Sequence, residues 1–164
     1  RAALTGHLVL STLHTKDAIS TPIRLIDMGA PPYMVATSLH AVLAQRLVRL
    51  VCESCAEPHQ PDGAEMNWLA ARTGEAPGEA RFKRGRGCSH CNGTGFLGRI
   101  GIYEMLEMNV ELVRAASSSD TSLFTEVAKR QMAGRALGDN AFRLAAQGRT
   151  TIEEAVRVAS AQEE

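Results

Sequence analysis

The chain has no excess of either charge and few aromatic side chains. Its 164 residues include 18 basic and 18 acidic side chains, so the formal net charge is zero, and 4% of the residues are aromatic. Nucleic-acid-binding proteins rely on surplus positive charge and on exposed rings that stack on bases. The composition therefore argues against a nucleic-acid partner.

Long apolar segments are also missing. A membrane-spanning helix needs about 20 consecutive apolar residues, and no run in the sequence approaches that length. We therefore expect no transmembrane segment, so attachment to a membrane would depend on partner proteins.

Nothing in the sequence resembles a secretory signal peptide, which favours the reducing cytoplasm. The first residues, Arg1 to Gly6, resemble the end of a helix closed by a glycine, so we expect a C-terminal piece of a longer protein.

The phosphate-binding pattern Gly-x-x-x-x-Gly-Lys-Ser/Thr does not occur in the sequence. Without that loop and its lysine, these residues have no means of holding and polarising the phosphates of ATP. We therefore expect the 164 residues alone not to hydrolyse ATP.

All four cysteines occur in two identical pairs, Cys52-Glu-Ser-Cys55 and Cys88-Ser-His-Cys91. Each Cys-x-x-Cys pair delivers two thiolates from one tight turn, and two pairs complete a tetrahedral zinc site. Four thiolates leave no open position for water or substrate, so we predict a structural Zn²⁺ ion rather than a catalytic one. Two disulfides or four free thiols are the alternatives.

Residues 56–87, between the two pairs, are rich in proline and glycine and contain one candidate helix, residues 66–72. A metal would close the base of this loop-rich segment, tying the strand that ends at Cys52 to the one that begins near Arg99. A basic patch precedes the second pair, and with no net positive charge we interpret it as a solvated or subunit-facing loop. Its members are Arg81, Lys83, Arg84 and Arg86.

Hydrophobic periodicity predicts an α/β protein. The apolar run 7–14 is typical of a strand buried on both faces of a parallel sheet. A helix should follow, starting either at Lys16-Asp17 or later at Pro22 and ending at Gly29. We also expect a helix over 32–46, strands over 46–52 and 99–107, and C-terminal helices that begin at Asn109, Asp120 and a capping box over 150–153.

Residues 4–15, Leu-Thr-Gly-His-Leu-Val-Leu-Ser-Thr-Leu-His-Thr, resemble the histidine box of the secretion traffic ATPases. These are the hexameric motors of type II secretion and type IV pilus assembly. The paired Cys-x-x-Cys turns point to the branch that serves secretion and pilus extension. The similarity spans nearly the whole chain and continues through residues 25–29, 43–49, 98–104 and 148–154.

The resemblance implies the C-terminal part of a RecA-like P-loop ATPase core, after the Walker B motif. On this basis we expect residues 1–51 to end the ATPase core, 52–98 to form a zinc-binding tetracysteine subdomain, and 99–164 to form a returning strand and a helical subdomain. The parent protein would bind ATP and Mg²⁺ and hydrolyse ATP as a homo-hexamer. It would be cytoplasmic and peripheral at the inner membrane, attached through secretion or pilus platform proteins.

His14 is the candidate catalytic residue. Ligands of parallel α/β sheets lie beyond the carboxyl ends of the strands, where His14 would fall, and the resemblance also implies that it senses the γ-phosphate, helped by Ser11 or Thr12. On a strand, His7 would lie about 23 Å away, so we assign it to packing or an interface. The alternative for His14 is a hydrogen bond that caps the next helix.

Arg99 is a second candidate for nucleotide binding. Its guanidinium could stack on adenine or contact a phosphate, and the resemblance places the segment 98–104 near the nucleotide. An ion pair with Glu104 is the alternative.

Two functions of other classes fit less well. Residues 88–95 match the Cys-x-x-Cys-x-Gly-x-Gly repeat of DnaJ-type co-chaperones, but that repeat occurs once here instead of four times. A zinc-ribbon adaptor or nucleic-acid module would need a basic surface and exposed aromatic side chains. We therefore prefer the hypothesis of a secretion or pilus ATPase to that of a zinc-binding interaction module without enzyme activity.

Overall fold

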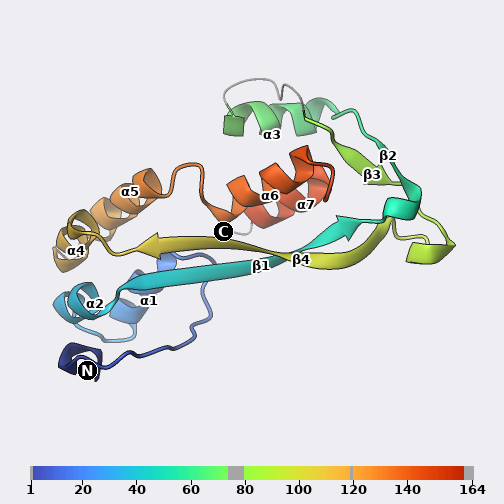
Figure 1. Cartoon of the computed structure of the whole chain (residues 1–164). Coiled ribbons are helices and arrows are strands. Elements are labelled where there is room, and N and C mark those ends of the chain that lie inside the picture. The colour runs from blue at the N-terminus through green and yellow to red at the C-terminus, as the bar shows by residue number, and fades with distance from the viewer. Residues whose placement is uncertain (1, 74–79, 119, 161–164) are drawn as a thin grey trace. The chain divides into compact units, whose positions relative to one another are not determined.

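The computed structural model describes residues 2–73, 80–118 and 120–160 (Figure 1). The chain forms two compact units, each built from two separate stretches of sequence. Unit 1 comprises residues 1–44 and 103–136, and unit 2 comprises residues 45–102 and 137–164.

The two units contain different elements. Unit 1 contains a 3₁₀ turn (Ala2–Thr5), α1 (Ser20–Asp27), α2 (Pro32–Ser38), α4 (Val110–Ser117) and α5 (Thr121–Gln131). Unit 2 contains β2 (Ala56–Pro58), α3 (Gly63–Thr73), β3 (Lys83–Gly85), α6 (Leu137–Ala146), α7 (Ile152–Ser160) and two 3₁₀ turns (Glu53–Cys55 and Ser89–Cys91). Strands β1 (Ala41–Val51) and β4 (Phe96–Glu107) contribute residues to both.

The strands form two small sheets in the described part of the chain. Strands β1 and β4 pair with each other, and Figure 1 shows them running in opposite directions. Strands β2 and β3 form a short antiparallel ribbon in which Glu57 lies opposite Arg84. The ribbon lies within the segment that separates the two cysteine pairs.

Each unit has its own core. In unit 1, α2 and α5 pack on α4, and the buried cluster includes Ala18, Leu106, Leu112 and Phe124. In unit 2, α7 packs on α6 and α3, with fully buried side chains at Leu69, Leu137 and Ile152. None of the helices among the described residues combines the length and the apolar character needed to cross a bilayer.

The predicted strand over 7–14 is wrong. These residues have no regular secondary structure, and Leu8 and Leu10 are 87% and 86% exposed. A buried strand needs neighbours that satisfy its backbone and cover its faces, but β1 and β4 pair with each other in the described residues. The strand-based separation of His7 and His14 no longer applies.

The helix predicted over 32–46 ends early, at Ser38. Leu39 already has an extended backbone, and residues 41–51 form β1, whose exposure alternates along the strand. The apolar residues at 42 and 43 therefore belong to a strand with period two rather than to a helical stripe. The strand predicted over 46–52 is the second half of β1.

Local signals at the helix ends were better predictors. The side chains of Asn109 and Asp120 cap α4 and α5 as expected. Helix α1 starts at Ser20, later than Asp17, but Asp17 Oδ1 accepts the Ser20 N–H at 2.7 Å and so fulfils the capping role. Pro22 lies in the first turn of α1, where a missing N–H is tolerated.

The capping box of α7 lies one residue later than predicted. Thr151 Oγ1 accepts the Glu154 N–H at 3.2 Å, whereas the Thr150 hydroxyl donates to the Arg49 carbonyl at 2.7 Å. Adjacent threonines offer the same capping chemistry, and the tertiary bond to β1 decides between them.

Candidate metal centre

The four cysteine side chains converge at one point in unit 2. All four Sγ atoms lie within 4.8 Å of one another. The Sγ–Sγ distances are 4.0 Å for Cys52–Cys88, 3.9 Å for Cys55–Cys91 and 3.7 Å for Cys88–Cys91. In a tetrahedron with metal–sulfur bonds of about 2.3 Å, the sulfurs lie about 3.8 Å apart. The cluster therefore has the dimensions of a tetrathiolate metal site.

Disulfides do not account for this cluster. A disulfide requires sulfurs about 2.05 Å apart, and all four cysteines are free. Cys52, Cys55 and Cys91 are buried, and Cys88 is partly exposed. The prediction that the four cysteines come together is confirmed at the level of geometry, and the arrangement fits a single metal ion.

Backbone N–H groups point at two of the sulfurs. Gly87 N donates to Cys55 Sγ at 3.3 Å, and the N–H groups of Cys88 and Gly95 donate to Cys91 Sγ at 3.3 and 3.2 Å. Such bonds stabilise negative charge on sulfur, which is the form that binds metal. The turns that present the cysteines therefore also prepare them as ligands.

The pKa values of the Cys55 and Cys91 thiols are shifted in opposite directions. Burial raises the pKa of Cys55 to about 11, whereas the backbone hydrogen bond from Cys88 lowers the pKa of Cys91 to about 6. The cluster therefore favours the thiolate form at Cys91 and the thiol form at Cys55, and a divalent metal would displace the thiol protons on binding.

Two glycines allow the backbone to close around the cluster. A Cβ atom on Gly85 would lie 2.0 Å from the Gly95 carbonyl oxygen, and Gly95 has a φ of +77°. The same Gly95 carbonyl accepts the Cys52 N–H at 2.9 Å. Glycine is required at both positions because any side chain would collide with backbone.

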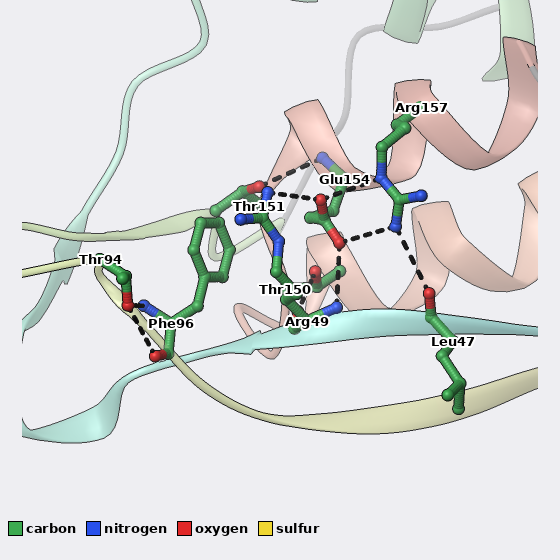
Figure 2. A network of polar contacts seen from close by, with 8 residues as sticks. All are labelled: Leu47, Arg49, Thr94, Phe96, Thr150, Thr151, Glu154 and Arg157. Carbon is green, nitrogen blue, oxygen red and sulfur yellow. Dashed lines mark hydrogen bonds and ion pairs between the residues drawn. The ribbon is translucent and has the colours of Figure 1, made fainter. Parts of the chain in front are cut away.

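A buried carboxylate links α7 to β1 elsewhere in unit 2 (Figure 2). Glu154 is 1% exposed and accepts the Arg49 N–H at 2.9 Å and Arg49 Nη2 at 2.7 Å. Arg157 adds bonds from Nε at 3.1 Å and Nη2 at 3.0 Å. Burial alone would raise the pKa of Glu154, but the hydrogen bonds from Arg157 and Arg49 lower it to about 2.

The Arg49 guanidinium has a second partner. Its central carbon lies 4.0 Å from the centroid of the Phe96 ring, so one arginine bridges β4 and α7, as Figure 2 shows. No pattern in the sequence predicts this network, because Arg49 and Glu154 are 105 positions apart. The only local signal is the acidic third position of the α7 capping box.

The candidate nucleotide-binding residues are exposed. His14 and Thr12 lie in the irregular segment of unit 1, and Arg99 lies on β4 in unit 2. The helix-capping alternative for His14 is filled by Asp17. Glu104, the ion-pair alternative for Arg99, is 3% exposed and accepts the Ala18 N–H at 2.7 Å.

The fold is similar to that of a known motor. A crystal structure of the pilus retraction motor PilT with bound ADP superposes with a TM-score of 0.57 at 18% identity, covering 96% of this chain and 35% of that one. The likeness confirms an α/β fold of this type.

Sequence comparison is more specific. The type II secretion system protein E of Pseudomonas aeruginosa is 40% identical over 158 residues, covering 96% of this chain and 31% of the relative. The type IV pilus assembly ATPase PilB of Thermus thermophilus is 40% identical over 153 residues, covering 93% of this chain and 17% of the relative. The chain thus spans about a third or less of the length of these relatives. Since the family described as type II/IV secretion system protein also matches residues 1–157, the chain belongs to that family.

Proposed function

We propose that this chain is part of an ATPase that hydrolyses ATP, with Mg²⁺, to power type II secretion or type IV pilus assembly. The observation that carries the proposal is the identity of about 40%, over most of the chain, to relatives named for these two systems. The family match favours a motor over the co-chaperone and adaptor readings.

The arrangement of the parent protein follows from the same proposal. Residues 1–51 would end a RecA-like core, 52–98 would be the metal-binding subdomain, and 99–164 would be the returning strand and helical subdomain. The parent would act as a homo-hexamer in the cytoplasm, docked at the inner membrane on secretion or pilus platform proteins. Arg99 and Thr12 would contact the nucleotide.

The metal in the proposal is a structural Zn²⁺ ion held by Cys52, Cys55, Cys88 and Cys91. Thiolates are soft ligands that select zinc over magnesium or calcium, and the sulfur spacing suits the zinc–thiolate bond length. With all four positions taken by sulfur, the ion would stabilise the turns and take no part in hydrolysis.

His14 is the proposed γ-phosphate sensor. Replacing His14 by alanine in the parent protein should lower kcat for ATP by roughly tenfold or more, because a group that acts on the reacting phosphate stabilises the transition state. Metal content should not change. The measurement is steady-state ATP turnover with metal analysis of the same samples.

His40→Ala is the matched control, because His40 is also an exposed histidine of unit 1 and has no assigned role in hydrolysis. It should leave kcat within about twofold of the parent value. Normal turnover by His14→Ala would refute the sensor role.

The 164 residues by themselves should show no ATP turnover above a no-protein control. The sequence holds no phosphate-binding loop or its lysine, and without them ATP cannot be positioned for hydrolysis. A phosphate-release assay on the isolated segment, with the parent protein as the positive control, tests this. ATP turnover above the no-protein control that follows the segment through purification would contradict this prediction.

A further inference from the structure

A buried carboxylate on β4 holds the backbone of the turn that follows the histidine segment. Glu104 is 3% exposed, and its Oε1 accepts the N–H of Ala18 at 2.7 Å. Ala18 is fully buried in the core of unit 1. The bond joins residues 86 positions apart within one compact unit, so it fixes the turn to the strand.

The turn itself is closed by short-range hydrogen bonds. The hydroxyls of Thr15 and Thr21 lie 2.8 Å apart, Thr15 Oγ1 also bonds the Asp17 carbonyl at 3.2 Å, and Asp17 Oδ1 accepts the Ser20 N–H. Residues 15–21 therefore form a connected structure that Glu104 attaches to β4.

His14 immediately precedes this turn. Residues 7–14 have no regular structure, so the backbone position of His14 depends on the element to which it is joined. A buried carboxylate costs more free energy than an apolar side chain of similar size unless it is well hydrogen-bonded. On β4, Glu104 lies in sequence between the buried apolar residues Ile102 and Leu106. An apolar side chain would be expected at such a position, but the Glu104 carboxylate accepts a hydrogen bond from the turn.

We propose that Glu104 is a positioning residue for His14: by accepting the Ala18 N–H it fixes the turn and so holds His14 in place for the γ-phosphate. The inference rests on the proposed role of His14 in ATP hydrolysis. Glu104 would act through the turn and not by contact with the nucleotide. Misplacing a catalytic group by about 1 Å can cost up to about a hundredfold in rate, so a single anchor of this kind can affect turnover.

Two substitutions in the parent protein weaken the Glu104–Ala18 hydrogen bond to different degrees. Glu104→Gln keeps the size and a carbonyl acceptor but removes the charge, and it should lower kcat roughly threefold. Glu104→Leu removes the acceptor and should lower kcat roughly tenfold. The KM for ATP should stay within about twofold in both, because the interaction acts on the reacting phosphate and not on nucleotide binding.

A control separates positioning from loss of stability. Leu112→Ala removes a fully buried side chain of the same core and should lower the unfolding temperature without lowering kcat below that temperature. Hydrogen exchange of the Ala18 amide gives an independent readout. Its rate should rise at least about tenfold in Glu104→Leu, and less in Leu112→Ala, since Leu112 does not bond to this amide.

The double variant His14→Ala/Glu104→Leu decides the mechanism. If Glu104 acts through His14, the double variant should be no slower than His14→Ala alone. A multiplicative loss, or a normal kcat in Glu104→Leu beside a slow His14→Ala, would overturn the positioning role and leave the proposed function intact. Normal turnover by His14→Ala would refute both. If Glu104→Leu does not fold, a wild-type kcat in Glu104→Gln overturns the inference.

Discussion

Replacing Cys88 by serine in the parent protein should abolish stoichiometric metal binding and unfold the region around the four cysteines while the rest of the protein stays folded. Serine has nearly the size of cysteine, but its hydroxyl is a poor zinc ligand beside a thiolate. Structural zinc contributes on the order of 10 kcal/mol to the folding of small metal-binding domains, which is comparable to the whole stability of a typical domain.

The reason for so large an effect is that, among the described residues, the cysteines form a small buried cluster of their own. In the part of the chain that the structure describes, this cluster consists of Cys52, Cys55 and Cys91, and Cys88 packs against it. The neighbouring sheet is a ribbon of three-residue strands. A region with so little apolar burial needs a metal or a covalent link to stay folded.

Metal analysis and hydrogen exchange together test this prediction. The parent protein should hold one zinc ion per chain, and either Cys88→Ser or a strong chelator should expose the amides that close the cluster before any others. These include Cys52 N, bonded to Gly95 O, and Arg86 N, bonded to Cys55 O.

Ser89→Ala is the matched control, since Ser89 is the exposed neighbour of Cys88 and is not a ligand. It should keep the zinc and the protection of these amides. If the Cys88→Ser protein kept its zinc and the protection of these amides, the metal site would not be what keeps this region folded.

The features that could be predicted from the sequence are those whose cause is local. Within each pair only two residues separate the cysteines, and the Cys-x-x-Cys turn directs both sulfurs to the same side, so the two pairs can share one metal ion. The caps at Asn109 and Asp120 depend on a side chain and an N–H two or three residues later. Signals of this kind require no knowledge of the remaining fold.

The features that could not be predicted depend on distant neighbours. The run 7–14 has the composition of a buried strand, but a strand exists only where another strand pairs with it. The segment 39–46 fits both a helical and an alternating pattern, and pairing of β1 with β4 decides for the strand. The Glu104–Ala18 and Arg49–Glu154 hydrogen bonds join residues 86 and 105 positions apart, so no local spacing in the sequence predicts them.

The charged network of Glu154 should make unit 2 sensitive to a single substitution. A shift of this carboxyl pKa from 4.5 to about 2 corresponds to at most about 3 kcal/mol of stability at neutral pH. The side chains of Arg49 and Arg157 are 46% and 57% exposed, and solvent screening reduces the expected value to about 2 kcal/mol. Glu154→Gln should therefore lower the free energy of unfolding by about 2 kcal/mol, and Glu154→Ala by about 3 kcal/mol, because it also leaves the Arg49 N–H without its acceptor.

The same network predicts a pH dependence of known sign. The folded-state pKa of Glu154 lies below its unfolded-state value, so its stabilisation is complete above about pH 4.5 and is lost as the pH falls towards about 2. The difference in unfolding temperature between the parent protein and Glu154→Gln should therefore be full at pH 6 and shrink steadily below about pH 4.5. Taking the difference cancels the titration of the other carboxylates.

Glu153→Gln isolates the network from a general loss of negative charge. Glu153 is exposed on the same turn of α7, so its substitution makes the same change in net charge without touching the buried bonds. It should alter the free energy of unfolding by less than about 0.5 kcal/mol. If Glu154→Gln destabilised the protein no more than Glu153→Gln, or if its deficit were as large at pH 3 as at pH 6, the ionised carboxylate would not be what joins α7 to β1.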